Sequence, residues 1–364
     1  MLSTAHDVAD GRLLRLVDAL RQVGLSVEVV GRGDAADGPT GAVVRTLPRR
    51  HTGRVAGLVA RASAAVSRPL SARGVVLITL TPDPLPAAEL RRMLGRGPYV
   101  ADCQEDYLAL LADRTWATGI AGQAARGLAR VARAVAARAD LTVVADDHVP
   151  PNTARRRLVV RNLPSAGYLP EPGHMGPTPR AIYIGDVRRS RGLQTMVAAI
   201  EAAPNWRLDI VGPVSQDDAS WLDHWRSTSA AADRVTVHGR RPPREAWALA
   251  TGAWVGLALL ESTPAFVAAV PSKVYEYLAC GLPAVVTPLP RAAALIAESG
   301  AGAVVRDAAE AARVLEAYAA EPLRLAAERE AARAWWSKLA DEPSAYDEMA
   351  HEVRRLVDER RATG

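Results

Sequence analysis

The sequence predicts an α/β protein built from two doubly wound, Rossmann-like domains. Short apolar strands alternate with amphipathic helices, and this alternation indicates parallel sheets that are covered by helices on both faces. A length of 364 residues suits two domains of ordinary size, each with its own core. Between the two halves, residues 165–180 are rich in Pro and Gly and carry no apolar period, which is typical of a linker.

The alternation is clearest in the C-terminal half. There we expect strands at Ala181–Ile184, Arg207–Val211, Val235–His238, Val255–Leu260 and Ala284–Thr287. Between them we expect helices at Arg191–Ala202, at Arg244–Thr251 and around Lys273. In such a domain a ligand binds at the carboxyl ends of the strands.

The N-terminal half repeats the pattern less cleanly. We expect helices at Gly11–Val23 and near Arg126–Arg138, and strands at Leu25–Val30, Val75–Leu80, Tyr99–Ala101, Leu141–Val144 and Leu158–Val160. Near the other end of the chain, Glu328–Arg361 is charged and helical in character, and Pro343 is expected to divide it into two helices. Trp335 and Trp336 suit either packing on another domain or a local core.

These observations place an N-terminal domain at 1–164, a linker at 165–180, a C-terminal domain at 181–340 and a terminal helix at 341–364. No apolar run approaches the length needed to span a bilayer, and the N-terminus lacks the pattern of a secretory signal, so we expect a cytoplasmic protein. Cys103 and Cys280 lie in different domains without metal-ligand spacing, and we interpret them as small buried residues. The excess of Ala and Arg suggests a bacterial source.

The most informative segment runs from Pro271 to Thr287. Ser272 is a good helix N-cap, and Gly281 followed by Pro283 is a good helix stop. Lys273 would face the positive end of the helix dipole, which is unfavourable unless an anion binds there. A solvated surface lysine is the alternative. However, only Lys273 and Lys338 are lysines in this arginine-rich chain, which favours an anion site.

This segment resembles the P-S-K-x-x-E-Y-L-A-x-G-x-P-V-V signature of retaining glycosyltransferases of the GT-B fold, in glycosyltransferase family four (glycosyl transferases group 1). The resemblance implies that Lys273 and Glu276 bind a nucleotide-sugar donor, with Glu276 accepting hydrogen bonds from the ribose. It also implies two Rossmann-like domains facing across a cleft, with a C-terminal helix crossing back to the N-terminal domain.

A second anchor, Tyr183 to Leu193, has a strand that ends at Gly185, a basic loop and a helix that we expect to open at Ser190-Arg191-Gly192. Two helix N-termini with cations could converge on one diphosphate, although a solvated basic loop is an equal alternative. The resemblance implies that Arg191 contacts the donor diphosphate. Arg188 is a nearby basic residue that matches the family pattern more loosely. Asp186 stands where family members often have Arg.

Three further features belong to the expected donor site. Gly212 and Gly239 end strands, and the resemblance places the loop of Gly239 and Arg240 near the nucleotide base, although either glycine could form an ordinary turn. Many family members carry a second Glu eight positions before Glu276, where this chain has Ala268. Glu261 is a weak substitute for it.

The N-terminal domain is expected to hold the acceptor. Val100 to Tyr107 resembles a D-x-H-E element of the family, which matches Asp102 and Glu105 and puts Gln104 in place of the His. A metal site or a solvated acidic loop are alternatives for these carboxylates. Residues 3–7 replace the Gly-rich first loop of the family, and His6 is a further candidate for acceptor contact.

A basic surface is also expected on this domain. One helix is expected to carry arginines on one face (Arg126, Arg130 and Arg133) and apolar residues on another (Leu128, Val131 and Val135). In addition, residues 49–73 contain seven basic residues, counting His51, and no acid. The net charge of +5 permits attraction to anionic membranes. An ordinary solvated face is the alternative. Nucleic acid is not an expected partner, because the basic stretches lack interleaved aromatic residues.

Taken with the resemblance, these residues predict a retaining glycosyltransferase that uses a nucleoside-diphosphate sugar, with UDP as first choice, and that needs no metal or other cofactor. Arg191 and Lys273 would neutralise the leaving diphosphate. The acceptor is not specified by the sequence. A non-catalytic nucleotide-sugar-binding or scaffold protein is the alternative, and a nucleotide-sugar epimerase is a more distant one.

Overall fold

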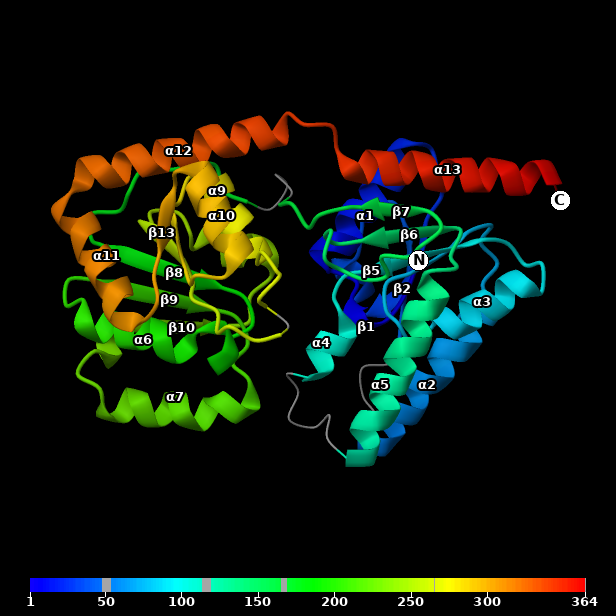
Figure 1. The fold of residues 1–364 in the computed structure, drawn as a ribbon, viewed down its shortest axis with the longest axis horizontal. Coiled ribbons are helices and arrows are strands. Elements are labelled where there is room, and N and C mark those ends of the chain that lie inside the picture. Colours follow the sequence, from blue (N-terminus) through cyan, green and yellow to red (C-terminus); the bar gives the residue numbers. More distant parts are fainter. Residues whose placement is uncertain (48–53, 113–118, 165–168, 265, 364) are drawn as a thin grey trace. The chain divides into compact units, whose positions relative to one another are not determined.

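The computed structural model of the protein describes all residues except 48–53, 113–118, 165–168, 265 and 364. The chain forms two compact units, one made of residues 1–162 with 343–364 and the other of residues 163–342 (Figure 1). We call them unit 1 and unit 2. Each unit contains one parallel sheet, so the predicted α/β class with two doubly wound domains is confirmed.

Unit 1 has a seven-stranded sheet in the order β3-β2-β1-β4-β5-β6-β7. Its strands are β1 (Leu2–Asp7), β2 (Glu28–Arg32), β3 (Val43–Thr46), β4 (Leu77–Thr79), β5 (Tyr99–Cys103), β6 (Leu141–Val144) and β7 (Arg157–Val159). Its helices are α1 (Gly11–Gln22), α2 (Arg54–Ser71), α3 (Leu85–Met93), α4 (Tyr107–Ala112), α5 (Gly119–Ala136) and α13 (Ala345–Thr363), with a 3-10 turn at Ala35–Asp37.

Two apolar clusters cover the two faces of this sheet. One joins α1 to α13, with Leu13, Val17 and Met349 buried together. The other joins α3 and α5 to the sheet through Leu85, Ala132 and similar residues. The terminal helix α13 therefore completes the core of unit 1, as expected for the fold class.

Unit 1 differs from the sequence expectation at its first strands. Residues 3–7, expected as a loop, belong to β1, which pairs with β2 and β4. Strand β3 was not expected, because it lies at the sheet edge and most of its side chains are exposed, so it lacks an apolar pattern. Residues 49–53 of the basic stretch and residues 165–168 of the expected linker lie outside the described residues.

Unit 2 has a six-stranded sheet in the order β10-β9-β8-β11-β12-β13. Its strands are β8 (Arg180–Ile184), β9 (Arg207–Val211), β10 (Val235–Gly239), β11 (Val255–Ala258), β12 (Ala284–Val286) and β13 (Gly302–Val304). Its helices are α6 (Leu193–Ala202), α7 (Gln216–Thr228), α8 (Pro243–Ala248), α9 (Ser272–Ala279), α10 (Pro290–Ser299), α11 (Ala308–Ala320) and α12 (Pro322–Ala340), with 3-10 turns at Arg189–Arg191 (η2) and Ala232–Arg234.

Two buried clusters again cover the two faces of the sheet, one around α6 and α11 and the other around α9 and α10. The predicted division of the C-terminal helical segment is confirmed, because α12 ends at Ala340 and α13 begins at Ala345, on either side of Pro343. Trp335 stacks on Tyr275 with ring centres 6.1 Å apart, so it packs within unit 2. Among the described residues, no helix is long and apolar enough to cross a bilayer.

Candidate functional site

The site in unit 2 lies where the strand order of the sheet reverses. Strand β8 stands between β9 and β11, and the chain leaves β8 on one side of the sheet and returns through β11 on the other. Such a switch point leaves a crevice at the carboxyl ends of the strands, where doubly wound domains bind ligands. Helices α6 and α9 follow β8 and β11, and therefore both begin at this edge (Figure 1).

Tyr277 fixes α9 over the switch point. Its hydroxyl accepts a hydrogen bond from the backbone N–H of Ile184 in β8 and donates one to the carbonyl of Leu257 in β11, both at 3.2 Å. A side chain at Gly256 would overlap the Tyr277 ring, so the glycine allows this close approach. The first turn of α9 is thereby held beside the end of β8.

Three glycines end the neighbouring strands β8, β9 and β10. Gly185 donates its N–H to the carbonyl of Val211, and Gly212 donates to the carbonyl of Gly239, both at 2.9 Å. At Gly212, φ is 148° and a Cβ atom would overlap the carbonyl oxygen of Gly185. The glycines predicted from the sequence thus lie in one row and leave the backbone of this edge open.

The entry to α6 differs from the expectation. Ser190 does not cap the helix; Arg189–Arg191 form the turn η2, and α6 begins after Gly192 at φ 90°. A side chain at Gly192 would overlap the carbonyl of Leu259 at the end of β11, which explains why glycine occupies this place. Arg191 consequently lies in the turn before the helix and not in its first turn.

Helix α9 also starts differently. Ser272 is its first residue, and the capping position belongs to Pro271, whose extended backbone leads into the helix without a side-chain cap. The predicted stop at Gly281 is confirmed: at φ 66°, it donates to the carbonyl of Leu278, while Leu282 donates to that of Tyr277. Because no side chain caps α9, backbone N–H groups in its first turn remain available to a ligand.

Lys273 is buried at the beginning of α9. It is only 5% exposed, and its ammonium group has no hydrogen-bond partner among the described residues. Nζ lies 3.6 Å from the centre of the Tyr183 ring, and it points to the end of β8, where a Cβ atom on Gly185 would lie 3.1 Å from it. A buried amino group without a hydrogen-bond partner lacks the acceptor that such groups normally have.

Burial holds the pKa of Lys273 well below its ordinary value, and the nearby positive charge of Arg191 lowers this pKa further. The carboxylates of Glu276 and Asp186 act in the opposite direction but do not outweigh burial. A bound anion beside Nζ would raise the pKa by favouring the charged form. The site therefore holds a lysine whose protonation depends on what binds next to it.

Three arginines lie in and directly before η2: Arg188 precedes the turn, and Arg189 and Arg191 belong to it. The guanidinium of Arg191 lies 5.6 Å from the Phe266 ring centre. Arg188 pairs with Asp186 at 3.3 Å, and Arg189 with Glu261 at 3.5 Å. The charge of Asp186, which departs from the family pattern, is thus neutralised by Arg188. The charge of Glu261 is likewise balanced by Arg189.

Glu276 lies one turn after Lys273 on α9 and is half-buried. Its charge acts on Lys273, in agreement with the side-by-side placement that the spacing predicts. Arg240 is exposed at the end of β10. His238, before it, has Nε2 2.8 Å from Oδ1 of Asp209, whose other oxygen pairs with Arg180, so this histidine belongs to a local network.

In unit 1 the expected acceptor residue Asp102 forms a buried ion pair. Its oxygens accept from Nη2 of Arg12 at 2.6 Å and from Nε at 2.9 Å, and both side chains are almost fully buried. Arg12 also donates to the carbonyl of Val160 and to Oδ1 of Asn162. Arg12 was missed as a partner because 90 residues separate it from Asp102 and no local pattern links them.

The other acceptor-side candidates lie near the same sheet edge. Gln104 donates to Oδ2 of Asp102 at 3.2 Å, whereas Glu105 is exposed. His6 lies at the end of β1, with its Nδ1 buried and without a hydrogen-bond partner among the described residues. The structure does not test a contact of these residues with an acceptor, so their role stays a prediction.

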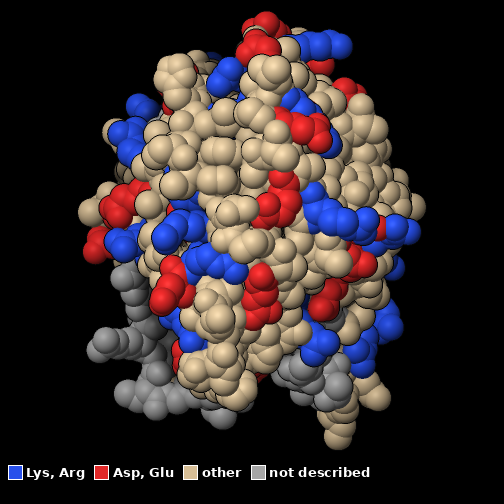
Figure 2. Space-filling view, turned by 90° about the vertical axis from the view of Figure 1, so that its left-hand side faces the viewer, with Lys and Arg blue, Asp and Glu red and all other residues tan. Residues whose placement is uncertain are grey.

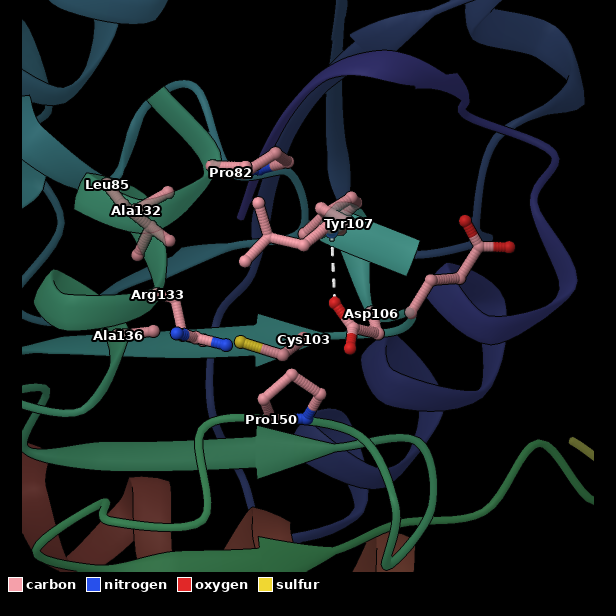
Figure 3. Close-up of a pocket in the computed structure, with 12 residues that line it drawn as sticks. Pro82, Leu85, Cys103, Asp106, Tyr107, Ala132, Arg133, Ala136 and Pro150 are labelled. Atoms are coloured by element: carbon pink, nitrogen blue, oxygen red, sulfur yellow. Dashed lines mark hydrogen bonds between the residues drawn. The ribbon is translucent and has the colours of Figure 1, made fainter. Parts of the chain in front are cut away.

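A small pocket opens beside Glu105, where β5, α3, α4 and α5 meet (Figure 3). Cys103, Leu85, Tyr107 and Arg133 contribute to its wall. Burial raises the pKa of the Cys103 thiol to about 12, and it does the same for Cys280 in unit 2. Both cysteines are therefore unreactive buried side chains, as expected.

Comparison with known proteins agrees with this geometry. Residues 178–320, which contain the switch-point site, match the family model described as Glycosyl transferases group 1. No curated protein matches the sequence.

Several solved structures share the fold. Sucrose-phosphate synthase from Thermosynechococcus elongatus is 16% identical, with a TM-score of 0.71 over 96% of this chain and 92% of that one. HepE from Anabaena, in complex with UDP and glucose, is 15% identical, with a TM-score of 0.66 over 95% and 96%. WaaG, a glycosyltransferase involved in lipopolysaccharide biosynthesis, is 14% identical, with a TM-score of 0.64 over 93% and 94%.

The resemblance read from the Lys273 segment is confirmed: residues 178–320 match the glycosyl transferases group 1 model, and the chain has the fold of GT-B glycosyltransferases.

Proposed function

We propose that this glycosyltransferase moves a sugar from a nucleoside-diphosphate donor to an acceptor hydroxyl with retention and without a metal ion. The observation that carries the proposal is the buried ammonium of Lys273, which has no hydrogen-bond partner among the described residues. Lys273 lies at the N-terminus of α9, and Arg191 is close enough for its charge to lower the Lys273 pKa. A diphosphate supplies the acceptor oxygens and negative charge that this arrangement lacks.

The donor would bind along the carboxyl edge of the unit 2 sheet. Its diphosphate would lie between Lys273 and Arg191, with Arg188 nearby and backbone N–H groups at Ser272 completing the anion site. Glu276 would accept hydrogen bonds from the ribose hydroxyls. The open backbone at Gly185, Gly212 and Gly239, with Arg240 beyond it, would take the nucleotide base. UDP is our first choice, and the HepE structures with UDP and UDP-glucose support it.

In the proposed step the bond between the anomeric carbon and the diphosphate oxygen breaks, and a bond to the acceptor oxygen forms on the same face. The acceptor proton passes to a phosphate oxygen of the leaving group. We favour this route because Asp186 and Glu261, the carboxylates near η2, are paired with arginines and are poorly suited as nucleophiles. Lys273 and Arg191 stabilise the charge that grows on the diphosphate.

Acceptor binding is proposed for the carboxyl edge of the unit 1 sheet, where His6, Gln104 and Glu105 lie. Asp102 would support this edge through Arg12 and Gln104. The chemical identity of the acceptor is left open.

UDP, GDP or dTDP is expected to raise the melting temperature without added metal, with UDP giving the largest shift. A nucleotide present at about a hundred times its Kd adds about 2.7 kcal/mol to folding stability. Thermal-shift measurements with and without a chelator test this, and Lys273→Met serves as the matched control that keeps side-chain volume. Loss of the shift on adding chelator would show that the metal-free site is wrong.

Nucleotide binding is also expected to take up a proton. Above its lowered pKa, Lys273 is neutral in the free protein, and the diphosphate restores its charge. Affinity should therefore fall as pH rises through that pKa, whereas the unliganded protein should gain stability as pH rises from it towards the ordinary value of 10.5. Calorimetry in buffers of different ionisation enthalpy measures the uptake. Equal proton uptake by Lys273→Met would assign the proton to another group.

A further inference from the structure

Three helices of unit 1 expose large apolar side chains. Of the thirteen exposed large hydrophobic residues in the described part of the protein, eight lie on α2, α3 and α5, and a ninth, Leu94, directly follows α3. We call this set the helical apolar surface; it consists of Leu58, Val59, Val66, Leu90, Met93, Leu94, Ile120, Leu128 and Val131. Ile120 is 87% exposed and Met93 72%. Single exposed apolar residues are common, but a group of this size indicates an interaction site.

The three helices form one layer. Helix α3 packs against both α2 and α5, and Figure 1 shows the three together on one side of the unit 1 sheet. Three of the exposed residues lie on α2, three on α5 and two on α3, and Leu94 directly follows α3. They therefore belong to one continuous layer and not to separate parts of the molecule.

Two of these helices have the reverse of the usual polarity. In α5 the buried positions are small residues, Ala129, Ala132 and Ala136, whereas Leu128 and Val131 face solvent. Helix α2 likewise buries Ala65 and exposes Val59 and Val66. A helix that only covers a core places its large apolar residues inward.

The charge of this layer is strongly one-sided. Arg68, Arg130 and Arg133 are exposed on α2 and α5, and Arg96 is exposed beside the end of α2, where it donates to the carbonyl of Leu70. Neither α2 nor α5 contains an acidic residue, and Glu89, the acid of α3, pairs with Arg92. In Figure 2, in which unit 2 faces the viewer, basic and acidic residues are instead interspersed.

We propose that the helical apolar surface docks on an anionic lipid bilayer. Its apolar side chains would enter the boundary between headgroups and acyl chains, and the surrounding arginines would pair with lipid phosphates. A second copy of the chain fits less well, because docking this layer on itself would bring like charges together. The proposal concerns unit 1 and is independent of donor chemistry at Lys273.

The test is co-sedimentation of the full chain with vesicles of phosphatidylcholine alone or mixed with phosphatidylglycerol. We expect binding to the anionic vesicles that weakens with salt. Ile120→Ser/Val131→Ser should weaken it at least tenfold, and Arg130→Gln/Arg133→Gln should weaken it several-fold. Far-UV circular dichroism should be unchanged, because all four side chains are exposed.

Matched controls carry the same changes elsewhere. Val43→Ser/Leu323→Ser removes two other exposed apolar side chains, and Arg207→Gln/Arg226→Gln removes two exposed arginines of unit 2. Both should bind vesicles as the wild type does. The proposal is overturned if the surface and control variants bind equally, if neutral vesicles bind as tightly, or if Ile120→Ser/Val131→Ser dissociates a dimer without changing vesicle binding.

Discussion

Lys273→Met is expected to lower turnover by about a hundred- to a thousandfold while the protein stays folded. Methionine fills the buried volume beside Tyr183 but cannot offset charge on a leaving diphosphate. The loss corresponds to about 2–4 kcal/mol of transition-state stabilisation, the size found when one preorganised charge or donor is removed. Because the variant no longer buries an amino group without a hydrogen-bond partner, its melting temperature without nucleotide should equal or exceed that of the wild type.

Arg191→Ala should cause a loss of similar size, and Lys273→Arg should recover little of it. A planar guanidinium is too wide for the space between Tyr183 and Gly185, where Nζ now lies. Steady-state turnover with a nucleotide-sugar donor tests all three. Near-wild-type turnover in both Lys273→Met and Arg191→Ala would remove this pocket from the mechanism.

Glu276→Gln provides the internal comparison. It should mainly weaken donor binding, because the ribose is remote from the reacting carbon, so KM for the donor should rise more than kcat falls. This split separates a residue that holds the donor from those that stabilise the leaving group.

Asp102→Ala is expected to destabilise unit 1 by about 3–5 kcal/mol, the usual cost of removing one partner of a buried ion pair. The variant would leave the Arg12 guanidinium buried beside neutral groups. Burial alone would lower the pKa of Arg12, but the charge and hydrogen bonds of Asp102 raise it above its ordinary value, so the two groups depend strongly on each other. Urea unfolding followed by circular dichroism, with hydrogen exchange of β1 and β5, measures the effect.

Glu105→Ala is the matched control, because Glu105 is an exposed carboxylate three residues away. Its stability should stay within about 0.5 kcal/mol of the wild type. Replacing both partners, as in Arg12→Met/Asp102→Leu, should recover part of the loss. If Asp102→Ala is as stable as Glu105→Ala, the carboxylate is not structural, and a direct acceptor role becomes the better explanation.

Local signals in the sequence predicted much of unit 2. The strands at Arg207–Val211 and Val255–Leu260 were recognisable because strands buried on both faces are short continuous apolar runs. Gly281 and Pro343 marked helix ends because glycine readily adopts the left-handed backbone conformation that ends a helix and proline interrupts one. Helix α7 was not expected, because it buries only Leu222 and Trp225 among many charged and polar residues. Elements with little burial carry little periodic signal.

The sequence predicted which residues belong to the site better than it predicted how they are arranged. The position of Lys273 after Pro271 was informative, but its burial depends on Tyr183, which lies 90 positions earlier. Ser190 was expected to cap α6, whereas the close approach of Leu259 determines that Gly192 begins the helix. Phe266, beside Arg191, had no local signal. Contacts between distant segments follow from the packing of the sheet, which the local pattern does not encode.

The path of the chain also has a consequence for synthesis. Unit 2 is one continuous stretch, residues 163–342, but unit 1 needs residues 343–364, since α13 supplies Met349 and Val353 to its core. On the ribosome, strands β1 to β7 emerge long before α13 and must wait with the apolar side of α1 uncovered. Unit 1 therefore begins to emerge before unit 2 but completes its fold after it.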